Sequence, residues 1–121
     1  MIGYKIVERT RDGGYRSLYI RAQGETRYVP NEKTVPNPDC GNLLVFNTLR
    51  EARSFFRDEG LSSLHCALFQ CEYEPAPDNL SWNMTVYFDR APLRRMEFWG
   101  MAPVGSRRAE SVTLLEEVDP W

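Results

Sequence analysis

The stretch that decides the fold runs from Asn47 to Gly60 and reads NTLREARSFFRDEG. Thr48 is suited to cap the start of a helix, and Glu51 stands three residues on as the reciprocal partner of a capping box. Gly60 fits the left-handed position just past a helix end. We therefore predict one main helix over about residues 48–59. Its apolar residues recur at the helical period and should face a core: Leu49, Ala52, Phe55 and Phe56.

The residues on both sides of this helix follow the two-residue period of strands. Asp12-Gly13-Gly14 is a turn signal of the kind that closes a hairpin. Residues 30–42 contain three prolines and no periodicity, which predicts a long irregular loop. Strands are expected at 3–9, 15–22, 25–29, 43–46, 64–73, 82–88, 93–99 and 111–118.

This order of elements defines the expected fold class. Strands, then one helix, then more strands indicate an α+β fold with a mainly antiparallel sheet of five or more strands packed by the one helix. A chain of 121 residues is long enough for one domain with a real core, so residues 1–121 should form a single α+β domain. No pattern of a closed barrel is visible, so we expect at least one open sheet edge and, from it, a possible homodimer.

Two of the expected strands have faces that matter for function. In 15–22, the face that should meet the core holds Leu18, Ile20 and Ala22, and the opposite face holds Tyr15, Ser17, Tyr19 and Arg21. In 64–73, alternation places Cys66 and Cys71 on opposite faces. Tyr and Arg are favoured at protein interfaces, so one candidate interface consists of Tyr15, Tyr19 and Arg21. The alternative is that the C-terminal segment covers this face.

Composition excludes some functions. The net charge is -2 and the pI about 5.4, which argues against a nucleic-acid coat protein. The 15 basic residues are nearly all arginine, since Lys5 and Lys33 are the two lysines. No apolar run has the length of a membrane helix or the form of a signal peptide, so we expect a cytoplasmic protein with no membrane partner.

The residues that usually carry chemistry do not converge. The three cysteines have no regular spacing, and Cys66 and Cys71 should point apart, which predicts no disulfide framework and no zinc site. Cys40 beside Gly41 could act as a nucleophile only with His65 as its base, and no local signature supports that pair. Glu72 and Glu74 share a strand face, where a solvated surface is the favoured interpretation over a metal or acid–base site. We assign no catalytic residue, metal or cofactor.

Arginines on the helix form the other candidate site. At the helical period Arg50, Arg53 and Arg57 lie within a narrow stripe, and like charges at this spacing repel each other. The stripe should therefore either meet carboxylates within the fold or bind an anionic partner. The internal or solvated arrangement is favoured, because the net charge is negative.

The order of segments resembles a set of small uncharacterised domains of phages and prokaryotes. The segments that carry the resemblance are residues 4–9, 43–56, 67–75 and 111–118. It implies a fold and a phage or bacterial setting, and no activity. We expect a small non-catalytic interaction module that binds a protein partner or itself. An anion or nucleic-acid binder that uses the helix arginines is the alternative, followed by an enzyme that acts on a nucleotide in a cleft of Arg and Glu.

Overall fold

The computed structural model describes residues 1–18, 26–36, 43–76, 85–87, 95–97 and 105–121. Within these ranges the fold is a mainly antiparallel sheet with one helix, as the sequence predicts. The helix is α1 (Leu49–Asp58). The strands are β1 (Ile2–Arg9), β2 (Tyr15–Ser17), β3 (Arg27–Tyr28), β4 (Lys33–Thr34), β5 (Leu43–Phe46), β6 (Cys66–Pro75), β7 (Thr85–Tyr87), β8 (Arg95–Glu97) and β9 (Ser106–Val118).

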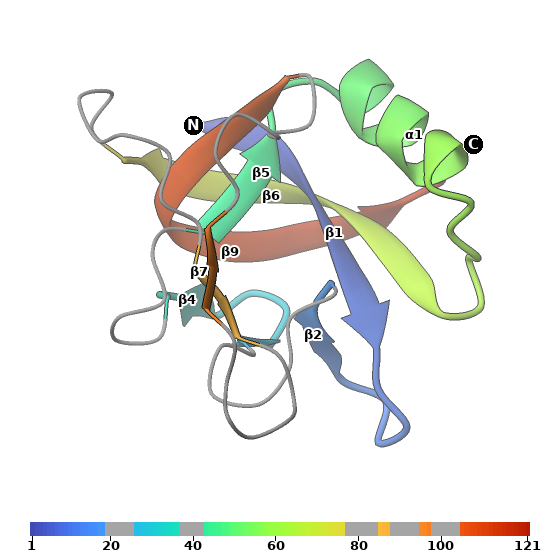
Figure 1. Ribbon diagram of the computed structural model, residues 1–121, viewed down its shortest axis with the longest axis horizontal. Coiled ribbons are helices and arrows are strands. Elements are labelled where there is room, and N and C mark those ends of the chain that lie inside the picture. The colour runs from blue at the N-terminus through green and yellow to red at the C-terminus, as the bar shows by residue number, and fades with distance from the viewer. Residues whose placement is uncertain (19–25, 37–42, 77–84, 88–94, 98–104) are drawn as a thin grey trace.

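Four of these strands close on themselves into a small barrel. β1 pairs with β6, β6 pairs with β9, β9 pairs with β5, and β5 returns to β1 through Tyr4 and Phe46. In Figure 1 the long strands β6 and β9 curve around the structure, and α1 lies beside them. β2 and β3 extend the sheet from β1, and β4 extends it from β9. The sequence showed no sign of this closure, because closure depends on pairings between distant segments.

Two hydrophobic clusters hold the barrel and the helix together. The first fills the barrel and is built from alternate residues of its strands, including Val7, Val45 and Phe69. The second lies between the barrel and α1, and there Phe56 is completely buried against Ile6 and Leu68. The side chains on both faces of β1 and β6 are therefore covered along much of their length.

Several predicted strands need correction. Residues 30–42 are not wholly irregular, because they contain β4, which pairs with β9. β9 begins at Ser106, five residues before the predicted start, because it also pairs with β5. The predicted strands at 82–88 and 93–99 lie mostly outside the described residues, and their described parts, β7 and β8, pair with each other.

The ends of α1 match the sequence prediction closely. The Thr48 hydroxyl accepts a hydrogen bond from the Glu51 backbone N–H (3.2 Å) and donates one to the Glu51 carboxylate (3.0 Å). At the other end Gly60 has a φ of 65° and donates to the carbonyl of Arg57, while Leu61 donates to that of Phe56. This pair of bonds is a Schellman motif, which satisfies two carbonyls that the helix itself leaves free.

Gly60→Ala should lower the free energy of unfolding by about 1–2 kcal/mol, because a Cβ is strained in the left-handed region. No heavy atom lies within 4 Å of the place a Cβ would occupy, so backbone strain alone is tested. Urea unfolding followed by circular dichroism measures the change. Glu59→Ala is the matched control, since Glu59 is exposed with an ordinary φ of -83°. An equal loss in both variants would contradict the prediction.

Candidate functional site

The three helix arginines differ in their contacts. Arg53 is half-buried, and its Nε donates to the backbone carbonyl of Asp119 (3.0 Å). Arg57 lies 3.4 Å from the carboxylate of Asp58, its neighbour in the chain, and both side chains are about 70% exposed. Arg50 is exposed and has no hydrogen-bonding or ionic partner in the described part of the chain. The stripe is therefore partly engaged within the fold, which favours a structural role for Arg53.

Replacing the helix arginines singly with alanine should separate these roles. We expect Arg53→Ala to lower the free energy of unfolding by about 0.5–1.5 kcal/mol, because it removes the hydrogen bond that holds the C-terminal segment to α1. Arg50→Ala should be near neutral, since exposed residues without partners contribute little. Thermal unfolding and retention on heparin are the measurements. Tight, salt-sensitive binding to nucleic acid that Arg53→Ala abolishes would contradict this assignment and promote the anion-binding function.

The aromatic interface candidate is described only in part. Tyr15 packs edge-on against Phe69, with the ring centroids 5.0 Å apart, and so contributes to the cluster inside the barrel. Ser17, predicted to point away from the core, is buried as well. The face predicted to be surface is therefore covered, because β2 packs it against the barrel cluster, whereas Leu18 on the opposite face packs against the second cluster as predicted. Tyr19 and Arg21 lie outside the described residues.

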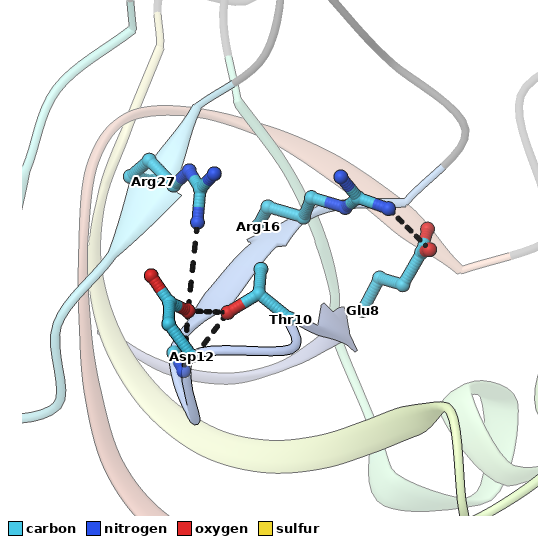
Figure 2. A network of polar contacts seen from close by, with 6 residues as sticks. Glu8, Thr10, Asp12, Arg16 and Arg27 are labelled. Carbon is cyan, nitrogen blue, oxygen red and sulfur yellow. Dashed lines mark hydrogen bonds and ion pairs between the residues drawn. The ribbon is translucent and has the colours of Figure 1, made fainter.

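A polar network at the hairpin between β1 and β2 binds two further arginines, Arg16 and Arg27. Arg16 is directly opposite Glu8 in the strand register, and the two form an ion pair at 2.9 Å. Figure 2 shows Arg27 reaching towards Asp12, at 4.0 Å, and the Asp12 carboxylate held by the Thr10 hydroxyl. These contacts, led by the hydrogen bond from Thr10, lower the pKa of Asp12. The network stabilises the turn and engages both arginines within the fold.

The cysteine and histidine candidates are not brought together. Cys66 lies in the cluster under α1 and Cys71 inside the barrel, which confirms the predicted opposite faces. His65 precedes β6 and is exposed, although the sequence placed it within that strand. No group of three His, Cys, Asp or Glu side chains among the residues described is arranged to hold a metal ion. Cys40 lies outside the described ranges.

The structure also places a lysine inside the barrel, which the sequence did not predict. Lys5 is 9% exposed, and its Nζ donates to the backbone carbonyl of Leu44 (2.6 Å) and lies 5.5 Å from the centre of the Tyr28 ring. Burial lowers the pKa of Lys5 to about 8, with the nearby Cys71 acting against that shift. Burial likewise raises the pKa of Cys71 to about 11 and raises that of Tyr28. Because the barrel encloses this amine, we expect Lys5 to affect the free energy of unfolding.

A small crevice lies where β6, β9 and the residues after α1 meet. Its volume is about 180 Å³, and Arg9, Cys66 and Glu117 are among the residues that line it. Arg9 binds the Glu117 carboxylate (2.9 Å) and the carbonyl of Ser63 (3.2 Å). Arg9 is therefore already bound by residues that line the crevice. The volume of the crevice also falls below the range of roughly 300–1,000 Å³ that is typical of ligand pockets.

The outer surface of the barrel away from α1 is the remaining candidate. There the strand register aligns Ile2 of β1 with Glu72 of β6, and Glu72 with Thr113 of β9. Glu116 lies opposite Gln70, whose side chain points to the same side as Glu72. Leu115 lies at the irregularity in the pairing of β6 with β9 and is exposed. We call this surface the open sheet face and define it as Ile2, Glu72, Thr113, Leu115 and Glu116.

Exposure separates this face from the half that α1 covers. Ile2 is 51% exposed and Leu115 36%. Ile6 lies on the same side of β1 as Ile2, four residues further along, and is 4% exposed. The sequence indicates a solvated carboxylate at Glu72 and gives no sign of the apolar residues on the neighbouring strands. Ile2 and Leu115 are far apart in the chain, so only the pairing of β1, β6 and β9 brings them to one surface.

Comparisons of this chain with family models, with curated proteins and with solved structures found no match. Over the residues that the structure describes, no helix has both the length and the apolar character needed to cross a membrane.

Proposed function

We propose that this protein is a small non-catalytic interaction module that binds a protein partner through the open sheet face. The observation that carries the proposal is the exposure of Ile2 and Leu115 on the paired strands β1, β6 and β9, beside a half of the same barrel where residues such as Ile6 and Leu68 are buried. Apolar side chains surrounded by polar ones are typical of protein interfaces. Its resemblance to small phage and prokaryotic domains supports a bacterial or phage setting for the partner.

The anion-binding alternative receives less support. Arg53 and Arg57 have contacts within the fold, and Arg50 alone does not form a basic patch. Sequence-independent binding to nucleic acid depends on several cations that neutralise phosphates together. Heparin retention of the arginine variants, described above, decides between the two functions.

The test uses an Ile2→Ser/Leu115→Ser double variant, which removes the two exposed apolar side chains of the open sheet face, on the strands either side of β6, without adding charge. Leu64→Ser is the matched control, since Leu64 is 80% exposed and lies before β6, away from this face. Proteins captured from an extract of the source cell by the wild-type chain are identified, purified and titrated against all three forms. We expect the control to bind as the wild type does and the double variant to bind at least tenfold more weakly.

Self-association is the other outcome of this experiment. Light scattering at high micromolar concentration should show whether the wild-type chain is a dimer and whether the double variant is a monomer. A dimer that the double variant abolishes would make a second copy the occupant of the face. Equal binding of all three forms to the purified partner would overturn the proposed function.

A further inference from the structure

The open sheet face carries unpaired negative charge beside its apolar residues. Glu72 and Glu116 are both exposed, and neither forms an ion pair with a residue in the ranges that the structure describes. The one lysine that the register places on this side of the described sheet is Lys33, opposite Thr113, and its Nζ lies 3.5 Å from the carboxylate of the nearby Glu74. The register places Glu72 and Glu116 on neighbouring strands and on the same side of the sheet. Glu116 pairs with Gln70, so the two carboxylates are diagonal neighbours, offset by two residues along β6.

From this arrangement we infer that the partner of the open sheet face is a basic protein segment, in which lysine or arginine flanks an apolar side chain. This inference rests on the proposed function and specifies the chemistry of its partner. The apolar side chain would cover Ile2 and Leu115, and the cations would lie against Glu72 and Glu116. Complementary charge of this kind sets the choice of partner and the rate of association.

Charge also decides against the other occupants. If two copies met through this same face, each would bring Glu72 and Glu116 towards the carboxylates of the other, and like charges at an interface disfavour it. Nucleic acid and anionic lipid surfaces would be repelled for the same reason. A basic segment is the occupant that relieves the unpaired charge, so the inference predicts a heterologous partner in place of a second copy.

The probe is a short synthetic peptide in which lysines flank an isoleucine, compared with the same peptide carrying glutamate in place of lysine. Binding is followed by nuclear magnetic resonance of the ¹⁵N-labelled full chain. We expect the lysine peptide to shift the amide signals of the open sheet face, with an affinity that falls as salt is raised. The glutamate peptide should cause no such shifts.

A Glu72→Gln/Glu116→Gln variant completes the test. It should bind the lysine peptide about fivefold more weakly, as expected when two exposed ion pairs are lost. Glu59→Gln is the control, since Glu59 is exposed and caps the C-terminal end of α1, outside the open sheet face. Equal binding by the two variants, equal binding of both peptides, or shifts centred on another surface would overturn the inference. If the glutamine variant retains the captured partner while Ile2→Ser/Leu115→Ser loses it, the proposed function stands and the basic partner is excluded.

Discussion

Lys5→Met should raise the free energy of unfolding at pH 7 by about 2 kcal/mol. The buried amine has a pKa of about 8 against an ordinary value of 10.5, and each pKa unit corresponds to about 1.4 kcal/mol. Keeping this charge inside the barrel therefore costs roughly 3 kcal/mol. Methionine avoids that cost but loses the hydrogen bond to the carbonyl of Leu44, which contributes about 1 kcal/mol, so the net gain is about 2 kcal/mol. Methionine fills a similar volume without a charge.

The pH dependence gives this prediction a second measurement. The pKa of Lys5 is lower in the folded state than in the unfolded chain, so between about pH 8 and 10.5 the unfolded chain binds more protons and stability rises with pH. The cost is fully present below pH 8 and has gone above 10.5. The raised pKa values of Cys71 and Tyr28 act in the opposite direction, from about pH 9 upwards. The difference between Lys5→Met and the wild type should therefore begin to shrink between pH 8 and 9.

Urea unfolding at several pH values, followed by circular dichroism, measures both effects. Lys33→Met is the control, because Lys33 is exposed and its side chain makes a long surface contact with Glu74, the one ion pair it has among the described residues. It should change stability by less than about 1 kcal/mol. Destabilisation by Lys5→Met throughout this pH range would show that the contacts of the amine outweigh the cost of burying it.

Phe56→Ala should lower the free energy of unfolding by about 3–5 kcal/mol, the usual cost of removing a fully buried aromatic ring. Phe56 is 0% exposed and lies between α1 and the barrel. Its ring also meets that of Trp121 edge-on, with the centroids 5.3 Å apart, so the variant should loosen the C-terminal segment as well. The total stability of a domain of this size is roughly 6–18 kcal/mol, so this one change removes a large fraction of it.

Phe55→Ala is the comparison for that variant. Phe55 is only partly buried and packs against Phe46 at a centroid distance of 5.3 Å. It should cost clearly less than Phe56→Ala, and hydrogen exchange at the amides of Asp119 and Trp121 should rise only in the Phe56 variant. A loss below about 2 kcal/mol for Phe56→Ala would mean that α1 contributes little to the barrel.

Sequence reasoning succeeded where neighbouring residues control the structure. The caps of α1 depend on Thr48 and Gly60, whose partners lie within four residues. β5 was predicted with its observed ends, and the opposite faces of Cys66 and Cys71 follow from the period of a strand. These features depend on backbone geometry that a short segment already carries.

Sequence reasoning was incomplete where the outcome depends on which segments pair. A charged residue such as Lys5 is expected on the exposed side of its strand. Closure of the barrel instead turns that side of β1 into the barrel interior. The candidate arginines were correctly grouped on one helix, but the bond from Arg53 to Asp119 joins residues 66 positions apart. Tyr15 was assigned to a surface because the chain does not show that β2 folds over the barrel.

The sequence by itself determined the helix, its ends, the hairpin turn, the ends of β5 and the alternation along β6, because each is set by local dihedral preferences and by the periods of helix and strand. The tertiary structure alone decided that β1, β6, β9 and β5 close into a barrel. It also decided that Lys5 is enclosed and that Ile2 and Leu115 share one exposed face. Burial and shared surfaces are properties of pairings across the whole chain, which no single segment encodes.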